Sequence, residues 1–219
     1  MDKTEMRMSR ADKFLIYGAT GYTGKLTARA AKAKGLSPIL AGRSEDKVKP
    51  LAEELGLEWR AFDLADQAKL DAALKEVAVV LHIAGPFSAT SKLMADACLR
   101  TKTHYLDITG EIAVFESLAA RDGEAKKAGV MLLPGVGFDV VPSDCLAAHV
   151  KRRLPDAEDL KIYIGGLGHV SRGTAKTGIE GIAKGTLVRR NGDIEPLEGL
   201  HEDMCDFGQG PQPTLAVSW

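Results

Sequence analysis

Three glycines, Gly18, Gly21 and Gly24, follow a short apolar run and precede a helical pattern. Glycines at such a strand-to-helix turn can hold the phosphates of a dinucleotide. We expect Gly18 to allow a sharp turn, Gly21 to let the backbone approach a pyrophosphate, and Gly24 to let the helix lie close to the strand. The phosphates would then lie against free backbone N–H groups and the positive end of the helix.

The context of these glycines supports a dinucleotide site. The first two glycines are three residues apart rather than two, and the alternative is an ordinary glycine-rich turn. The turn nevertheless follows a strand-like run and opens a helix rich in small residues, which is the context that the motif requires. The cofactor-binding residues expected here are Gly18, Thr20, Gly21, Tyr22, Thr23 and Gly24.

The second predicted strand ends at Gly42 and is followed by Arg43 and Ser44, with Lys47 one turn into the next helix. An NAD site usually has Asp or Glu at this strand end, to bind the ribose 2′-hydroxyl. An arginine suits a 2′-phosphate instead, through a charge-assisted hydrogen bond that contributes roughly 1.5–3 kcal/mol. We therefore expect Arg43 and Ser44 to bind NADP in preference to NAD. The alternative for Arg43 is a solvated surface arginine.

Two further strand ends carry candidate cofactor contacts. Asp63 follows the third strand, where a carboxylate can accept a hydrogen bond from the adenine amino group, although it could equally cap the next helix. Ala84, Gly85 and Pro86 follow the fourth strand, where the chain would pass the nicotinamide. Gly85 would allow close backbone approach there, and the alternative is a simple strand-to-helix turn.

These residues must be brought to one edge of a sheet by the elements between them. Strand-like runs alternate with helical patterns, which argues for a parallel sheet with helices on both faces. The expected strands are 13–18, 38–42, 58–63, 77–83, 103–109 and 130–134. The expected helices are 23–34, 44–55, 66–75, 90–102 and 113–127. The sequence therefore predicts an α/β fold with a doubly wound Rossmann sheet.

The pattern changes after about residue 139. The expected elements are a helix over 142–153, a strand over 160–166, a helix near 174–184, a hairpin of 186–190 and 194–197 around Asn191 and Gly192, and a strand from 214 that is cut short. We expect a disordered tail over 1–12, an NAD(P)-binding Rossmann domain over 13–142, and over 143–219 the start of a mixed α+β substrate domain. The chain is accordingly expected to be part of a longer gene product.

Composition narrows the class of protein. The formal net charge of -1 gives no sign of a nucleic-acid or acidic-membrane partner. The apolar run 77–84 is too short to span a bilayer. Cys98, Cys145 and Cys205 form no Cys-x-x-Cys pair, so neither a disulfide framework nor a metal site is expected, and a reducing cytoplasm fits best.

Five segments together resemble the saccharopine dehydrogenase-like oxidoreductases: 18–24, 41–43, 84–87, 105–111 and 134–139. The nearer likeness is to the branch that contains the trans-acting enoyl reductases of bacterial lipid synthesis and the saccharopine dehydrogenase-like oxidoreductases of animals. The resemblance covers nearly the whole chain, and members are substantially longer. It implies NADP-linked reduction, a Rossmann domain followed by an α+β domain that covers the nicotinamide, a substrate that varies across the group, and a homodimer.

Three acids are candidates for proton transfer. Asp107, Glu111 and Asp139 follow the fifth and sixth strands, on the side where parallel sheets bind their ligands. Hydride transfer belongs to the cofactor, so the protein orients the ring and supplies or accepts a proton. A carboxyl group acting as an acid near neutral pH needs a pKa raised by burial. The alternative for each residue is a helix cap or a loop hydrogen bond.

Other candidates are less specific. The hydroxyls and basic residues of 169–177 could bind a substrate carboxylate or the cofactor at a helix start, or could be a capped and solvated helix start. His82 lies in the apolar fourth strand and is expected to be a satisfied core residue. No tyrosine is followed four residues later by lysine, so the Tyr-x-x-x-Lys pair of the short-chain dehydrogenases is absent.

The function expected is that of an NADP-dependent oxidoreductase. It would transfer a hydride between NADPH and a C=C, C=N or C=O bond of a small-molecule substrate. The alternatives are a non-catalytic NADP-binding sensor on the same fold, which the missing Tyr–Lys pair keeps open, and an atypical sugar-nucleotide or isoflavone-type reductase. Hydride exchange with a substrate panel would separate an enzyme from a sensor.

Overall fold

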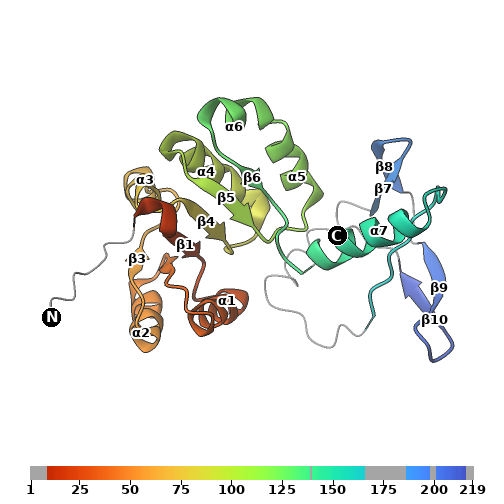
Figure 1. Ribbon diagram of the computed structural model, residues 1–219, viewed down its shortest axis with the longest axis horizontal. Coiled ribbons are helices and arrows are strands. Elements are labelled where there is room, and N and C mark those ends of the chain that lie inside the picture. Colours follow the sequence, from red (N-terminus) through yellow and green to blue (C-terminus); the bar gives the residue numbers. More distant parts are fainter. Residues whose placement is uncertain (1–8, 139, 166–185, 198–200, 216–219) are drawn as a thin grey trace. The chain divides into compact units, whose positions relative to one another are not determined.

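The first part of the chain is built on one parallel sheet. The computed structural model describes residues 9–138, 140–165, 186–197 and 201–215, and the chain divides into two compact units after residue 138. The sheet consists of β1 (Phe14–Tyr17), β2 (Ile39–Gly42), β3 (Trp59–Ala61), β4 (Val79–His82), β5 (His104–Asp107) and β6 (Leu132–Leu133). Their order is β3-β2-β1-β4-β5-β6, with every pair parallel (Figure 1). The expected doubly wound α/β fold is confirmed.

The strand order defines where a ligand can bind. The chain runs outward from β1 to β3 and then returns to the other side of β1 to form β4. Connections that diverge from two neighbouring strands leave a crevice outside the carboxyl ends of those strands, and ligands bind there. The register pairs Tyr17 with His82 at these ends. The segments that follow β1 and β4 therefore meet at the switch point.

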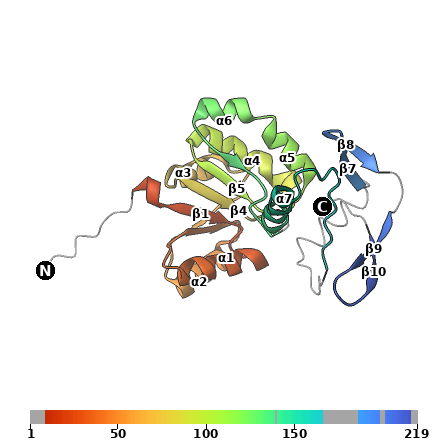
Figure 2. The same ribbon diagram turned by 45° about the vertical axis from the view of Figure 1, so that its right-hand side comes forward.

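Helices cover both faces of the sheet (Figures 1 and 2). They are α1 (Tyr22–Ala33), α2 (Glu45–Leu55), α3 (Gln67–Lys75), α4 (Phe87–Thr101), α5 (Ile112–Ala119) and α6 (Asp122–Ala128). Alternate residues of β1 face opposite layers. Ile16 packs with Val48 of α2, whereas Leu15 and Tyr17 belong to the cluster that contains Met94 of α4. Burial of each leucine-sized side chain stabilises the fold by about 1.5–3 kcal/mol.

Helix α4 begins at Phe87, earlier than the sequence pattern predicts. The carboxylate of Glu111 accepts hydrogen bonds from the backbone N–H groups of Phe87 and Ser88, each at 2.8 Å. The first N–H groups of a helix have no partner within the helix, so an acceptor from elsewhere stabilises the first turn. The carboxylate of Glu111 thus stabilises an additional turn at the start of α4. The pattern of apolar residues within α4 cannot predict this contact, because Glu111 lies outside the helix.

The single helix expected over 113–127 is wrong, because α5 and α6 are separate helices. Arg121 lies between them with a non-helical backbone conformation, φ -96° and ψ 10°. Its guanidinium contacts Asp96 of α4 at 2.8 Å and Glu124 of α6 at 3.1 Å. The change of direction therefore coincides with an ion-pair cluster that ties the two short helices to α4.

Residues 9–12 fell within the segment expected to be a disordered tail. In the structure, Arg10–Asp12 form a short 3-10 helix. The guanidinium of Arg10 donates hydrogen bonds to the carbonyl groups of Val77, Thr101 and Lys102, at 2.9, 2.9 and 2.8 Å. Arg10 thereby holds the start of the chain to the segments that precede β4 and β5.

The described residues of the second unit form a helix and two antiparallel pairs of strands. Helix α7 (Val141–Arg153) is followed by the hairpin of β7 (Thr186–Arg190) and β8 (Asp193–Leu197). Asn191 and Gly192 both have positive φ, as the predicted hairpin turn requires, and the hairpin is confirmed. The second pair is β9 (Glu202–Asp206) with β10 (Pro211–Leu215). Strand β9 has no counterpart among the expected elements.

Some expectations for this unit fail or lie outside the described residues. Residues 160–165 are not assigned as a strand, and no described segment pairs with them. The expected helix 174–184 lies wholly outside the described residues, and the strand expected from residue 214 is described only as far as Leu215, the end of β10.

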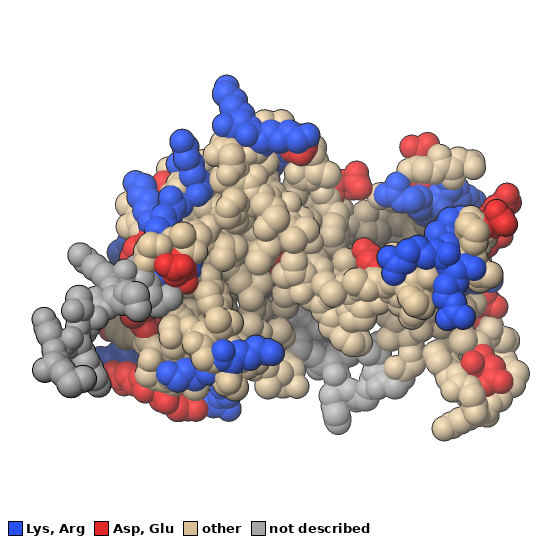
Figure 3. Space-filling view, viewed as in Figure 1, with Lys and Arg blue, Asp and Glu red and all other residues tan. Residues whose placement is uncertain are grey.

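The surface carries charges of both signs. Figure 3 shows basic and acidic side chains interspersed on the face viewed, in keeping with the formal net charge of -1. Among the residues that the structure describes, no helix is both long and apolar enough to cross a membrane.

Candidate functional site

The glycine turn after β1 has the shape expected of a phosphate-binding turn. Gly18 has φ +89°, and a Cβ placed there would lie 2.8 Å from the carbonyl carbon of Ile83. A Cβ on Gly24 would overlap the carbonyl oxygen of Gly18 and lie 2.8 Å from the carbonyl carbon of Ala19. Gly21 is exposed, and a Cβ there would meet only the Gly18 oxygen, at 3.4 Å. The fold itself therefore requires Gly18 and Gly24, whereas Gly21 leaves the outer side of the turn open.

The first turn of α1 presents unpaired backbone donors. Gly21 is the N-cap residue, and its N–H donates to the carbonyl of Gly18 at 3.1 Å. In the described part of the chain, the N–H groups of Tyr22, Thr23 and Gly24 have no backbone acceptor. Unpaired N–H groups and the positive end of a helix together attract an anion. Thr20 is half-buried and Tyr22 is 72% exposed beside this turn.

The end of β2 carries unpaired cations. Arg43 and Lys47 are exposed, and neither side chain makes an ion pair or hydrogen bond with any described residue. Ser44 is the N-cap residue of α2, but its side chain does not make the capping hydrogen bond. The first acids after the strand, Glu45 and Asp46, lie within the first turn of α2. The position after Gly42 where an NAD site would have its carboxylate is thus occupied by an arginine whose side chain is unpaired within the described part of the chain.

Asp63 follows β3 and is exposed. Its Oδ1 accepts a hydrogen bond from the N–H of Ala65 at 2.9 Å, and so it shapes the turn into α3. The cap of α3 is supplied by Asp66, whose Oδ1 accepts from the N–H of Lys69 at 3.1 Å. The helix-cap role left open for Asp63 therefore belongs to Asp66. Its contact with adenine stays a prediction.

Asp107 is completely buried at the end of β5. Its Oδ1 accepts from the N–H groups of Thr109 and Gly135, at 3.0 and 2.9 Å, and its Oδ2 accepts from the hydroxyl of Tyr105 at 2.5 Å. Burial raises the pKa of Asp107, although these hydrogen bonds oppose the change. The carboxyl group therefore ties the segment after β6 to the end of β5.

The other two predicted acids differ from Asp107. Glu111 is half-buried, and both of its carboxylate oxygens accept N–H groups from the first turn of α4, as described above. Asp139 lies outside the described residues. The catalytic roles of all three acids stay predictions, and the geometry gives Asp107 and Glu111 the loop and cap interactions that were their alternatives.

A group of rings lies beneath this edge of the sheet. His82 is fully buried, with ring centroids of Tyr17, Phe87 and Tyr105 at 5.8, 5.5 and 6.2 Å. Its Nε2 lies 2.9 Å from Oγ1 of Thr90, but its Nδ1 has no hydrogen-bond partner among the described residues. Burial lowers the pKa of His82 to about 3. The expected core histidine is buried and neutral, but only half of its hydrogen-bonding capacity is used.

Tyr17 lies beside His82 in this group. Its hydroxyl donates to the carbonyl of Phe62 at 3.1 Å, which links β1 to the end of β3. Burial, followed by the nearby charge of Asp63, raises the pKa of Tyr17 to about 12. The phenol therefore stays protonated and holds the sheet edge on which the candidate residues stand.

The second unit brings together an acid, a lysine and a tyrosine that sequence spacing did not reveal. Oδ2 of Asp203 accepts from Nζ of Lys161 at 2.7 Å and from the hydroxyl of Tyr163 at 2.6 Å. The hydrogen bond to Asp203 raises the pKa of Tyr163. The candidate segment 169–177 lies outside the described residues, and so its role is untested.

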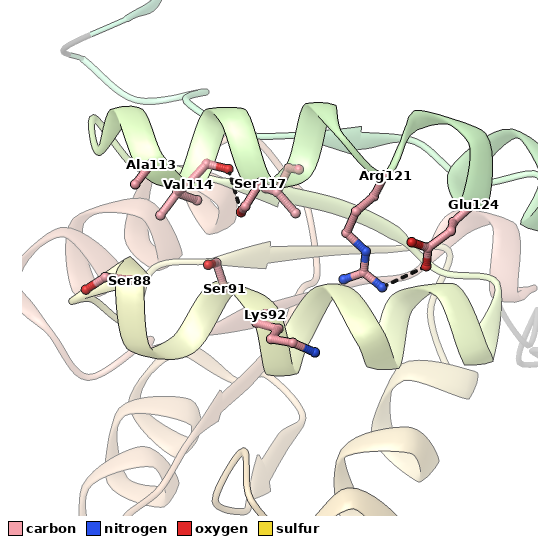
Figure 4. Close-up of a pocket in the computed structure, with 9 residues that line it drawn as sticks. Ser88, Ser91, Lys92, Ala113, Val114, Ser117, Arg121 and Glu124 are labelled. Carbon is pink, nitrogen blue, oxygen red and sulfur yellow. Dashed lines mark hydrogen bonds and ion pairs between the residues drawn. The ribbon is translucent and has the colours of Figure 1, made fainter.

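A cavity of about 650 Å³ lies between α4 and α5 (Figure 4). Ser88, Ser91 and Lys92 line it from α4, and Arg121 lines it beside α6. The guanidinium of Arg121 is already paired with Asp96 and Glu124, so it offers no free cation to a ligand. No group of three or more His, Cys, Asp or Glu side chains suited to a metal ion occurs in the described ranges.

Together, the parallel sheet, the glycine turn at its switch point and the unpaired arginine after β2 define a Rossmann dinucleotide-binding protein. The family model for the saccharopine dehydrogenase NADP binding domain matches residues 14–133. The chain belongs to that family, and its cofactor is NADP. The match covers the first unit, rather than nearly the whole chain as the sequence resemblance suggested.

Comparisons with individual proteins agree with this assignment. The chain is 34% identical over 148 residues to a trans-acting enoyl reductase of Mycobacterium leprae, an alignment that covers 64% of this chain and 35% of that protein. It is 31% identical over 157 residues to a trans-acting enoyl reductase of Mycobacterium tuberculosis, covering 67% of this chain and 38% of that protein. The chain thus matches little more than a third of the length of these relatives.

A solved structure supports the fold. Saccharopine dehydrogenase (L-Glu forming) from Saccharomyces cerevisiae superposes with a TM-score of 0.58 at 20% sequence identity, covering 66% of this chain and 32% of that one. At this identity, the likeness concerns the fold alone.

Proposed function

We propose that this protein is an NADP-dependent reductase that transfers a hydride between NADPH and a C=C bond conjugated to a carbonyl group. The observation that carries the cofactor half of the proposal is Arg43, an exposed arginine at the end of β2 whose side chain has no partner among the described residues. The names of the relatives favour a C=C bond over the C=N and C=O bonds that the sequence leaves open. A small-molecule substrate, a homodimer and a cytoplasmic location complete the proposal.

The residues at the switch point fit the dinucleotide. The open side of Gly21 and the free N–H groups of Tyr22 and Thr23 would hold the pyrophosphate, with Thr20 beside them. Arg43 would hold the 2′-phosphate together with Ser44, whose hydroxyl is not used by the helix it caps.

The remaining contacts concern the two rings of the dinucleotide. Asp63 has a second carboxylate oxygen that is not used by the turn into α3, and it would accept from the adenine amino group. Ala84, Gly85 and Pro86 would lie along the nicotinamide. Bound NADPH supplies the hydride, while the protein orients the ring and manages the proton.

Proton supply is the less defined part of the proposal. Asp107 has the raised pKa that a carboxylic acid needs, but its oxygens are occupied by backbone and tyrosine donors. Glu111 stands beside the start of α4, and Asp139 is retained as a candidate from the sequence. We propose that one of these three acids donates the proton; to reach a substrate, Asp107 would have to break three hydrogen bonds and Glu111 two.

Deuterium transfer tests the reaction. NADPH labelled at either face of C4 is incubated with the protein and a panel of α,β-unsaturated thioesters, imines and ketones. We expect label to move from one face only, to the β-carbon of an unsaturated thioester. Tight NADPH binding with no transfer to any class would favour the non-catalytic sensor. Transfer to imines or ketones alone would contradict the assignment of the C=C bond.

A further inference from the structure

The segment 83–88 comprises the connection from β4 to α4 and the first two residues of α4, and it lies directly against the glycine turn. A Cβ on Gly18 would come within 2.8 Å of the carbonyl carbon of Ile83, at the start of this connection. Gly85, in contrast, is exposed, and a Cβ there would come no closer than 3.5 Å to the ring of Phe87. The fold therefore leaves space beside Gly85 that it does not use.

A threonine near the start of α4 holds the carbonyl groups of this segment. Oγ1 of Thr90 lies 2.8 Å from the carbonyl oxygen of Ala84 and 3.1 Å from that of Pro86. A hydroxyl has a single hydrogen to donate, and both of these partners are acceptors. Nε2 of His82, 2.9 Å from the same oxygen, must therefore be the donor to Thr90. His82 thus orients the hydroxyl toward the two carbonyl groups.

The same segment is also held through its N–H groups. The carboxylate of Glu111 accepts from Phe87 and Ser88 at 2.8 Å each. Thr90 engages the acceptors of the connection and Glu111 engages its donors. The connection is therefore held by two side chains that both lie outside it, Thr90 and Glu111.

We propose that Thr90 is a positioning residue for the nicotinamide half of NADP. By fixing the Ala84 and Pro86 carbonyl groups, it would position the backbone of residues 84–86, against which the nicotinamide would pack. The Pro86 carbonyl also accepts from the N–H of Ala89 at 3.2 Å, so both of its lone pairs are used. The Ala84 carbonyl oxygen has a second lone pair, which would remain available to the N–H groups of the nicotinamide carboxamide. The inference rests on the proposed function, because it requires the dinucleotide to bind at this switch point.

Comparison of a whole with a half cofactor isolates this role. Binding of NADPH and of 2′,5′-ADP, which lacks the nicotinamide, is measured for the wild-type chain and for Thr90→Val and Thr90→Ser. Valine keeps the shape of threonine without the hydroxyl, whereas serine keeps the hydroxyl. We expect Thr90→Val to raise the Kd of NADPH by about tenfold and that of 2′,5′-ADP by less than about twofold. Thr90→Ser should bind both ligands like the wild type.

Nicotinamide fluorescence gives a second reading. The emission change that accompanies NADPH binding should be diminished in Thr90→Val at saturation and retained in Thr90→Ser. Should Thr90→Val not yield folded protein, Thr90→Ala removes the hydroxyl without placing a methyl group against the carbonyl oxygens, and the same comparison applies.

The possible outcomes distinguish failure of the positioning role of Thr90 from failure of the proposed NADP-dependent function. Equal losses for NADPH and 2′,5′-ADP in Thr90→Val would make Thr90 a general structural residue and overturn the inference. Unchanged affinities and emission in that variant would also overturn it, while leaving the proposed cofactor intact. Failure of the wild-type chain to bind either ligand would instead refute the proposed function.

Discussion

Gly18 and Ile83 are in such close contact that a Cβ on Gly18 would lie 2.8 Å from the carbonyl carbon of Ile83. Gly18 directly follows the first strand of the sheet, and Ile83 directly follows the fourth. Their contact joins the turn that would hold the pyrophosphate to the connection that would face the nicotinamide. The two halves of the proposed site are therefore built as one piece, and a change at Gly18 should affect both.

Replacement of Gly18 by alanine should destabilise the fold and abolish tight NADPH binding. Its positive φ costs an alanine roughly 1–2 kcal/mol, and the clash with Ile83 adds about 1–3 kcal/mol. Gly35→Ala is a matched control, because Gly35 has φ +76° with no atom within 4 Å of its added Cβ. The free energy of unfolding of both variants, measured by urea denaturation, separates the steric clash with Ile83 from the cost of the positive φ. Equal losses of stability would show that Gly18 is required only for its φ.

Arg10 should contribute to stability more than its place near the start of the chain suggests. Its guanidinium bonds to three carbonyl groups from two connections, and such charge-assisted hydrogen bonds are worth about 1.5–3 kcal/mol. We expect Arg10→Ala to lower the free energy of unfolding by at least this amount. Arg29→Ala, which removes an exposed ion pair with Glu54, should cost about 0–1 kcal/mol. Similar losses in the two variants would contradict the account of Arg10.

His82 should make the fold sensitive to mild acid. Burial lowers its pKa to about 3 from an ordinary value of 6.5, so below pH 6.5 the unfolded chain binds a proton that the native protein does not. Stability should therefore fall as the pH decreases from 6.5 toward 3, by at most about 1.4 kcal/mol per pH unit. His82→Phe keeps a ring but does not titrate, so its stability should fall less steeply. Parallel curves for the two proteins from pH 7 to 4.5 would show that His82 is not the group responsible.

Asp107 should have the opposite dependence on pH. Burial raises its pKa, so just above the unfolded value the native protein binds a proton that the unfolded chain has lost. Stability then falls as the pH rises through the raised pKa. Relative to Asp107→Asn, the wild-type protein should become less stable as the pH increases from about 3.5, with a plateau once the carboxyl group is ionised. A difference that grows in favour of the wild type over this range would contradict the role of burial.

Local patterns predicted the sheet and its glycine turn well. Strands β1, β2 and β4 are short and largely apolar runs, and such a run indicates a buried strand from its own residues alone. Asn191 and Gly192 likewise specify a hairpin turn by their tolerance of positive φ. These signals are contained within a few neighbouring residues, which is why the sequence is enough to find them.

Contacts between distant residues were not predictable in the same way. Glu111 extends α4 by capping Phe87 and Ser88, and nothing near Phe87 indicates that cap. The hydrogen bond between His82 and Thr90 links β4 to α4, and it forms only once these two elements have packed together. The periodicity of apolar residues can place each of these residues on one face of its helix or strand. Only the folded structure shows that Glu111 meets the start of α4 and that His82 meets Thr90.

The site residues show the same difference between local signals, which the sequence reveals, and contacts between distant residues, which it does not. Gly18 and Gly24 could be identified from their spacing because the motif is local. That the Arg43 side chain has no partner among the described residues could be seen only in the structure. Asp107 looked like a candidate acid in the sequence, since its position after β5 is suggestive. Its three hydrogen bonds come from residues that include Gly135, far along the chain, and they give it a structural role.

The most direct test of the account is a titration of the chain with NADPH and with NADH, followed by nicotinamide fluorescence, beside Arg43→Ala. The wild-type chain should bind NADPH more tightly than NADH. Arg43→Ala should weaken NADPH binding by roughly 10- to 150-fold, which corresponds to one lost charge-assisted hydrogen bond, and leave NADH binding unchanged. Equal affinity of the wild-type chain for both cofactors, or no binding of either, would contradict the assignment of this edge of the sheet as an NADP site.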